Sequence, residues 1–520
     1  MTEQRHLGVA ARLAPATLIL MAGFVASRLS GLLRDVTIGG TFGTGPELDA
    51  YYAAFRLPDL LFQLLTGAAL ISAFIPTFSS YLSQGEEQEA WRMASSVITL
   101  LAIATAAGSL LAALFAPALM PLISPGFSPA QLDLVVNLTR IMLLSPVLFT
   151  VSTILAGVLN ARGHFALPSV APALYNTAIL CGALFLSAPL GVYGLAIGVA
   201  AGSALHLVIQ LPAILRLRFP YRIAFEWSHP GVREVVRLMG PRIAGLAAVQ
   251  ANFLVSTAIA STLSPGSLSA LNLAWPLMML PLGIGAVTVA SAAFPPLAEA
   301  AASQDRQSFH DTFETALRVI LYLTLPATAG LIFLSGPLVA LIYQRGGFDE
   351  ASSAAVAIAL IYYALGLPAH GVLEIATRAF YARKDTRTPV VVGLASMALH
   401  LALSLALKGP LQHGGLALSL SLATTAEALL LLLLLWRRVG ALGGRATVGS
   451  ALRSALASLL MLLPSVGLIH LLAPGGAGQP LFALSVVAAV IAGALTYLLT
   501  SRLLGSGETR LFLAGLRSRG

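Results

Sequence analysis

Long apolar stretches alternate with short polar connections along most of the chain. Each stretch has roughly 20 or more residues, the length that an α-helix needs to cross a bilayer. The pattern therefore predicts an all-α polytopic membrane protein with about 14 transmembrane helices. The candidate spans lie at residues 13–34, 57–82, 93–119, 134–159, 167–187, 191–215, 243–262, 268–297, 315–334, 352–377, 388–407, 413–436, 449–472 and 481–504.

Composition agrees with this pattern. Apolar residues make up 57% of the 520 positions and charged residues 10%, against roughly 25% charged residues in soluble domains. These values exclude a soluble enzyme, a disordered chain and a fibrous repeat. Cys181 is the single cysteine, which excludes a disulfide framework and a cysteine-rich metal site. We expect no metal and no cofactor.

The net charge of +9 predicts an orientation rather than a nucleic-acid partner. With the N-terminus inside, the inner segments hold 24 basic residues and the outer loops hold 2. This positive-inside asymmetry predicts that both termini are cytoplasmic. The longest inner connection, residues 216–242, reads as an amphipathic surface segment with affinity for anionic membrane lipids.

The sequence also repeats itself at an offset of 220–221 residues. Ala73–Pro76 recurs as Ala293–Pro296, and Arg162 recurs as Arg383, each followed by a proline six residues later. The offset contains six predicted helices, so the two lobes have the same topology, as in transporters that bind substrate between repeats. The expected domains are an N-lobe of six helices at 1–218, an amphipathic linker and C-lobe at 219–440, and two further helices with a cytoplasmic tail at 441–520.

The first span contains the densest group of intramembrane charges, Arg28, Arg34 and Asp35. A charge near the bilayer centre costs at least about 2.5–3.5 kcal/mol, so it marks a pathway or a partner. One interpretation is a structural Arg–Asp pair near a helix end. The other is an arginine that binds an anionic head group through its planar fork of donors. A stripe of small residues, Gly23, Ser27 and Gly31, predicts close approach of a neighbouring helix.

Charges elsewhere in the first half leave two readings open. Asp49, Arg56 and Asp59 flank the start of the second span, where they are either exposed interfacial charges or part of a substrate site. Arg140 either lines a cavity or reaches the outer interface.

The second half offers three candidates for coupling or cavity roles. Glu374 and Arg378 are four residues apart on one predicted helix, which favours an ion pair. Glu427 stands among apolar residues. It is either a protonatable group or a carboxylate that snorkels to the interface or is held by a hydrogen bond between helices.

The sequence lacks the motifs of several other classes. It contains no Walker A loop, no HExxH, no CxxC and no nucleophile elbow. The loops are also too short for a catalytic domain. We therefore predict that the protein is not an enzyme.

The order and spacing of several motifs resemble the MurJ/MviN family of lipid II flippases, within the multidrug/oligosaccharidyl-lipid/polysaccharide exporter superfamily. The resemblance covers about residues 15–440. Its motifs are Ser27–Asp35, Phe42-Gly43, Asp49-Ala50, Phe55–Pro58, Gly67-Ala68, Ala73–Pro76, Leu159–Arg162, Tyr343–Phe348, Ala382–Pro389 and Gly415–Leu418.

The resemblance implies a function in peptidoglycan biosynthesis, cell wall biogenesis and cell shape. Family members move undecaprenyl-pyrophosphate-linked precursor, lipid II, from the inner to the outer leaflet by alternating access. It implies substrate-binding roles for Arg28, Arg34 and Asp49, with Asp35 and Arg56 nearby. It also implies that the last two helices form a groove for the lipid tail and that the protein is a monomer.

Two stretches depart from the family pattern. Where the family has an arginine-bearing stretch and then Glu-Gly-Ala, this chain has Phe62 and Thr66. Where the family has another cavity arginine, it has an uncharged stretch around Pro276. These departures leave two alternatives to lipid II transport: an exporter of another polyprenyl-linked glycan or amphiphile, and a non-transporting scaffold for envelope synthesis.

Overall fold

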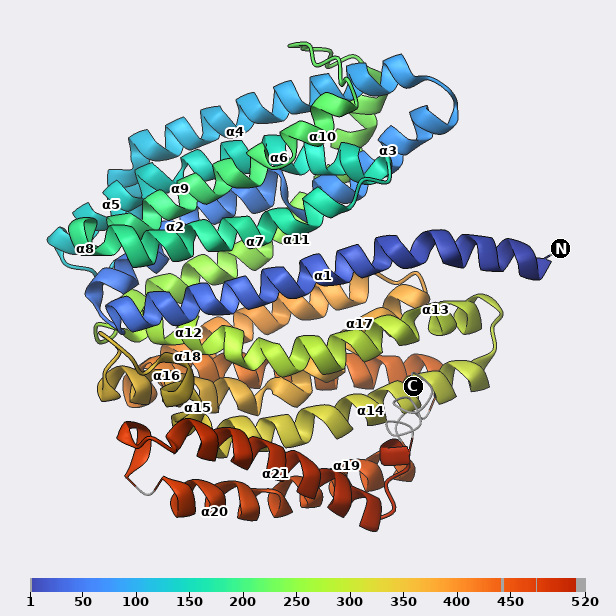
Figure 1. Ribbon diagram of the computed structural model, residues 1–520. Helices are drawn as coiled ribbons and strands as arrows, with labels where there is room; N and C mark the ends of the chain where they lie inside the picture. The colour runs from blue at the N-terminus through green and yellow to red at the C-terminus, as the bar shows by residue number, and fades with distance from the viewer. Residues whose placement is uncertain (1, 441–443, 474, 511–520) are drawn as a thin grey trace. The chain divides into compact units, whose positions relative to one another are not determined.

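The computed structural model describes residues 2–440, 444–473 and 475–510 (Figure 1). Every regular element in these ranges is a helix. The predicted all-α class is therefore confirmed, and the protein matches the expected polytopic architecture.

The chain divides into two compact units, residues 1–262 and 263–520. The helices of the first unit are α1 (Thr2–Phe42), α2 (Pro46–Leu65), α3 (Gly67–Ser83), α4 (Glu87–Ile123), α5 (Pro129–Met142), α6 (Leu144–Ala161), α7 (Ala166–Cys181), η1 (Gly182–Leu186), α8 (Ser187–Leu190), α9 (Tyr193–Val208), α10 (Leu211–Arg216) and α11 (Pro230–Ser261).

The second unit is built in the same way from long helices and short breaks. Its helices are α12 (Ser267–Pro281), η2 (Leu282–Val287), α13 (Thr288–Ala302), α14 (Arg306–Phe333), α15 (Ser335–Tyr343), α16 (Glu350–Leu365), α17 (Leu367–Ala382), α18 (Arg387–Val439), α19 (Arg445–Leu460), α20 (Leu462–Leu472), η3 (Gly476–Gly478) and α21 (Phe482–Leu503).

Several predicted spans consist of two helical pieces. The second span breaks at Thr66, between α2 and α3. The predicted spans 388–407 and 413–436 lie within the 53-residue α18, where Gln412 has a non-helical backbone with φ of 50°. In the described ranges, nine helices have the length and composition of a membrane span, or ten if the bent pair α16–α17 is one span. The predicted count of fourteen is consistent with these elements.

Helix α11 packs against α2, α3 and α4 and thus belongs to the first unit. The sequence repeat predicts that this helix follows the linker and begins the second lobe. The domain boundary after residue 218 stays a prediction that rests on the sequence repeat. In the structure, α11 packs with the first unit.

The last helices form a layer on the second unit. Helix α19 packs on α14, α20 packs on α21, and α21 also contacts α15 (Figure 1). These helices correspond to the two spans that the sequence analysis places outside the repeat.

The two arginines related by the repeat make the same kind of contact in their own units. The guanidinium carbon of Arg162 lies 5.0 Å from the ring centre of Trp91 on α4. That of Arg383 lies 6.0 Å from the ring centre of Phe309 on α14. Both contacts have cation–π geometry, so the sequence repeat is accompanied by a repeated contact.

Candidate functional site

The Arg34 side chain on α1 is held by two neighbours. Its Nε and Nη2 atoms donate to Asp35 Oδ1 at 3.0 and 2.8 Å. Its Nη1 atom donates to Oδ1 of Asn176 on α7 at 2.9 Å. A guanidinium carries five N–H groups, so two remain available. The side chain is about a quarter exposed (27%), so these two groups can still reach a ligand.

Asn176 also binds the backbone of α1. Its Nδ2 atom donates to the Ser27 carbonyl oxygen at 3.1 Å and to Ser30 Oγ at 3.3 Å. One buried amide therefore fixes both the arginine and the helix that presents it. Asn176 is not among the predicted site residues, because an asparagine within an apolar helix has no spacing pattern of its own.

The stripe of small residues on α1 explains why α7 comes so close. A Cβ atom on Gly23 would lie 2.5 Å from Ser169 Cβ, and one on Gly31 would lie 3.4 Å from Asn176 Nδ2. Figure 1 shows α1 running beside α7. The stripe is a packing surface, as predicted, and its small residues bring Asn176 within hydrogen-bond distance of α1.

Arg28 lies apart from this cluster. It is exposed, and its guanidinium carbon lies 5.1 Å from the ring centre of Phe24. Asp35 pairs with its neighbour Arg34 rather than with Arg28. The two arginines of α1 therefore differ, since one is held by polar partners and the other is presented at the surface of its unit.

A second polar group joins α2 to α11. Arg56 Nε donates to Thr257 Oγ1 at 2.9 Å, and its guanidinium carbon lies 5.5 Å from the ring centre of Phe253. Asp59 Oδ2 accepts from Gln250 Nε2 at 3.1 Å. These contacts are interhelical and half-buried, so the interpretation of Arg56 and Asp59 as exposed interfacial charges is wrong in this structure.

Asp49 and Arg140 occupy different surroundings. Asp49 is buried in the first turn of α2, where a carboxylate is stabilised by the helix dipole. Arg140 is exposed, and its Nε donates to the Ala113 carbonyl oxygen on α4 at 3.2 Å. None of the contacts found for Arg140 joins it to the Arg34 cluster.

The positions that depart from the family pattern pack internally. The ring centre of Phe62 lies 5.3 Å from that of Phe149. Thr66, at the break between α2 and α3, is fully buried, and its Oγ1 lies 2.6 Å from Thr150 Oγ1. In the second unit, Trp275 stands before Pro276 with its ring centre 5.3 Å from that of Tyr363. At these positions the side chains therefore make aromatic and hydroxyl contacts within their own units.

Two candidates of the second unit are held by hydrogen bonds. Arg378 pairs with Glu374 through Nη1, as their spacing predicts, and its Nη2 donates to Ser291 Oγ on α13 at 3.2 Å. The Glu427 carboxylate lies beside Gly393 in the other half of α18, since a Cβ atom on that glycine would be 3.3 Å from Glu427 Oε1. Across the described residues, no group of three or more His, Cys, Asp or Glu side chains could hold a metal ion.

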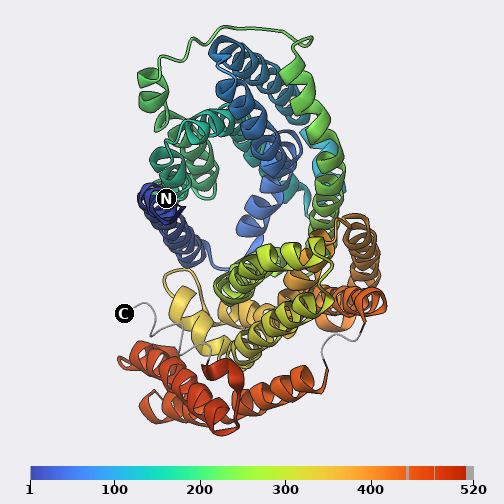
Figure 2. The ribbon, with the colours of Figure 1, turned by 90° about the vertical axis from the view of Figure 1, so that its right-hand side faces the viewer.

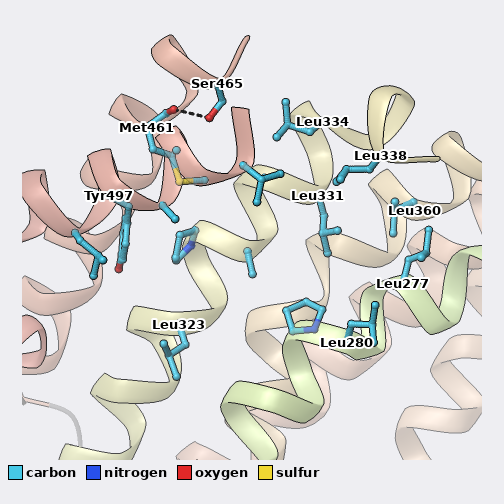
Figure 3. A pocket seen from close by; sticks show the side chains of 18 of the residues that line it. Leu277, Leu280, Leu323, Leu331, Leu334, Leu338, Leu360, Met461, Ser465 and Tyr497 are labelled. Atoms are coloured by element: carbon cyan, nitrogen blue, oxygen red, sulfur yellow. Dashed lines mark hydrogen bonds between the residues drawn. The ribbon is translucent and has the colours of Figure 1, made fainter. Parts of the chain in front are cut away.

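An apolar cavity of about 490 Å³ lies in the second unit between α12, α14, α20 and α21 (Figure 3). Leu277, Leu331 and Met461 are among the residues that line it. The polar atoms at its edge are bound internally. Tyr497 Oη donates to the Tyr322 carbonyl oxygen at 2.6 Å, and Ser465 Oγ donates to the Met461 carbonyl oxygen at 2.9 Å. The cavity therefore offers hydrocarbon contacts and suits an alkyl or prenyl chain.

Comparison with known proteins now identifies the family. The family model described as "Lipid II flippase MurJ" matches residues 38–500. The chain belongs to the MurJ family. It is 31% identical over 430 residues to the lipid II flippase MurJ of Burkholderia cenocepacia, covering 81% of this chain and 83% of that protein. It is 30% identical over 482 residues to a probable lipid II flippase MurJ of Bdellovibrio bacteriovorus, covering 91% and 92% of the two chains.

Solved structures agree with the MurJ assignment. A structure of lipid II flippase MurJ in an inward closed conformation matches with a TM-score of 0.78 and 27% identity, covering 94% of this chain and 98% of that one. A multidrug resistance MATE family transporter of the MOP superfamily matches with a TM-score of 0.66 and 14% identity, covering 79% and 94%. The latter shares the fold. Membership of MurJ and the membrane-spanning helices make this a multi-pass protein of the bacterial inner membrane.

Proposed function

We propose that this protein moves lipid II, the polyprenyl-pyrophosphate-linked peptidoglycan precursor, from the inner to the outer leaflet by alternating access. Family membership supports the substrate and the reaction. The observation that assigns a role to a particular residue is the hydrogen bonding of Arg34. Asp35 and Asn176 fix its guanidinium, while two of its N–H groups stay available.

The chemistry of a pyrophosphate fits this arrangement. Phosphate oxygens accept charge-assisted hydrogen bonds, which are worth about 1.5–3 kcal/mol each. A guanidinium whose rotamer is already fixed loses less side-chain entropy when it binds. We propose Arg34 as the main pyrophosphate contact, with Arg28 and Asp49 as further site residues and Arg56 as a contact tied to α11. Arg140, Glu374, Arg378 and Glu427 stay candidates for cavity or coupling roles.

The apolar cavity of the second unit suits the other end of the substrate. A polyprenyl tail is a long hydrocarbon that the bilayer already surrounds, so an apolar cavity holds it by van der Waals packing rather than by removing it from water. We propose that the cavity beside α20 and α21 receives part of this tail.

Reconstitution tests this assignment directly. The purified protein is placed in vesicles that contain lipid II, and the fraction of lipid II open to an external probe is followed. We expect transport by the wild type and its loss in Arg34→Ala, with partial retention in Arg34→Lys, which keeps the charge but not the fork of donors. Arg502→Gln, at the exposed end of α21, is the control for insertion and yield. Transport by Arg34→Ala at the wild-type rate would contradict the role given to Arg34.

A second candidate function is export of another polyprenyl-linked glycan. The uncharged contacts of Phe62 and Trp275 support it, because the family pattern that the sequence resembles implies arginines in these two stretches. Competition separates the two functions. Excess unlabelled lipid II should suppress transport of labelled lipid II, whereas stronger suppression by another lipid-linked glycan would favour the alternative.

We also propose that both termini are cytoplasmic and that the protein acts as a monomer. The arginine-rich inner connections support the orientation. In a Cys181→Ala background, Ser303→Cys between α13 and α14 should resist an impermeant thiol reagent in intact cells, and Gln344→Cys after α15 should react. The reverse labelling pattern would invert the topology. Light scattering in detergent should give a mass of one chain after subtraction of the micelle.

A further inference from the structure

The non-helical stretch between α10 and α11 has an unusual surface. Three large apolar side chains on alternate residues point outward: Ile223 is 73% exposed, Phe225 is 63% exposed and Trp227 is 57% exposed. The residues between them, Ala224 and Glu226, are only partly exposed. Alternation of this kind is typical of an extended segment with one outward face. Figure 2 shows the stretch running along the outer edge of the first unit between α10 and α11.

The stretch is fixed to the unit by Glu226 and by residues that precede Ile223. Arg92 Nη2 donates to Glu226 Oε2 at 2.8 Å, and Tyr221 Oη lies 3.1 Å from Thr99 Oγ1 on α4. Aromatic packing adds to these contacts, since the Phe219 and Trp91 ring centres are 4.9 Å apart. The outward apolar side chains are therefore held in place on a supported segment.

Three arginines accompany the apolar face. Arg216, Arg218 and Arg222 are all exposed. None of them forms an ion pair with an acidic residue in the part of the chain that the structure describes. The surface thus combines unpaired positive charge with apolar and aromatic side chains, including a tryptophan.

The backbone limits how deeply this surface can enter a membrane. Within the described residues, the N–H groups of residues 222–226 have no hydrogen-bond partner. Unbonded backbone groups are costly in the hydrocarbon core but are satisfied by water at the headgroup level. The stretch therefore suits the interface, where side chains dip into the acyl boundary while the backbone stays hydrated.

We infer that Ile223, Phe225 and Trp227 insert into the cytoplasmic leaflet and that Arg216, Arg218 and Arg222 bind the phosphates of anionic phospholipid headgroups. Both signals are needed, because apolar insertion and electrostatic attraction act together at a membrane surface. The choice of leaflet rests on the proposed orientation of the chain. The membrane contact itself does not depend on which substrate is transported.

Spin-label depth measurement tests this surface in the full-length protein. In a Cys181→Ala background, nitroxides are attached at Phe225→Cys and, as the matched control, at Glu86→Cys, an exposed position before α4 without a side-chain cap bond. Collision with oxygen, which concentrates in lipid, is compared with collision with a water-soluble nickel chelate. In vesicles of phosphatidylcholine and phosphatidylglycerol, the oxygen-to-nickel ratio at Phe225→Cys should exceed that at Glu86→Cys several-fold. Equal ratios at the two positions would overturn the insertion.

The role of the three arginines is tested by comparing vesicles with and without anionic lipid. The probe at Phe225→Cys should sit less deeply in vesicles of phosphatidylcholine alone than in vesicles with phosphatidylglycerol. Changing Arg216, Arg218 and Arg222 together to Gln should remove that difference while leaving the elution volume of the purified protein unchanged. The same depth in both lipids would overturn anionic-headgroup binding. The fluorescence of Trp227 itself, taken as the difference between the wild type and Trp227→Phe, gives a test without a spin label. Quenching of this emission by brominated lipids would support insertion, and absence of quenching would overturn it.

Discussion

Replacing Asn176 with alanine should weaken substrate binding through Arg34 more than it weakens the fold. Three hydrogen bonds are lost: the one from Arg34 Nη1 and the two that Asn176 donates to Ser27 O and Ser30 Oγ. The two neutral bonds are worth about 0.6 kcal/mol each on average inside membranes. We therefore expect a small decrease in thermal stability in detergent.

The charged bond matters for the site. It fixes the guanidinium before the substrate arrives, and ordering one such side chain on binding costs about 0.5–1.5 kcal/mol, so Asn176→Ala should weaken lipid II binding by about two- to tenfold. Arg34→Ala should weaken it further, because the charge and both available donors disappear. The assay is equilibrium binding of labelled lipid II to the purified protein. Thr177→Ala, which removes an exposed hydroxyl on the next residue of α7, is the control.

The double variant decides whether Asn176 acts through Arg34. If Asn176 only positions Arg34, then Asn176→Ala should cost no further affinity in an Arg34→Ala background, because the positioned group is gone. Additive losses of affinity in the double variant would refute this reasoning. They would mean that Asn176 contacts the substrate itself or supports the site through the helix packing alone.

Further predictions concern the apolar cavity, the contact between α1 and α7, and the connection between α17 and α18. Gly330→Leu should fill the apolar cavity, where a Cβ has ordinary space, and should reduce transport of the long-chain substrate more than of a short-chain analogue. Gly23→Val should lower the free energy of unfolding by about 1–3 kcal/mol, because the larger side chain overpacks against Ser169. Hydrogen bonds from Thr388 and Arg438 hold the pKa of Asp385 well below its usual range. This stabilisation is present above the ordinary carboxyl pKa and is lost as pH falls through the lowered one. Asp385→Asn should therefore lower the melting temperature at neutral pH, with a difference from wild type that shrinks in acid.

Much of the fold follows from the hydrophobic pattern. The all-helical class, the separation of α18 near residue 412 and the packing role of Gly23 and Gly31 all come from the length of apolar runs and the size of side chains. The ion pair of Glu374 and Arg378 follows from helical spacing alone. Local periodicity fixes these features, so a single sequence contains enough information.

Contacts between segments far apart in the sequence could not be predicted from hydropathy or helical spacing. The bond between Arg34 and Asn176 joins residues 142 positions apart, and that between Arg56 and Thr257 joins residues 201 positions apart. Such pairs depend on which helix faces lie together, and hydropathy does not record this. The packing of α11 on α2, α3 and α4 has the same origin, because a linker in the sequence does not reveal which helices the next span contacts.

The most direct test of the central claim is rescue of bacteria depleted of their own lipid II flippase. The measured quantity is the lipid II accessible at the outer face of the inner membrane. The wild-type protein should restore both growth and exposed lipid II, and Arg34→Ala should restore neither while reaching the membrane at the same level. Full rescue by Arg34→Ala would contradict a pyrophosphate site built on this arginine.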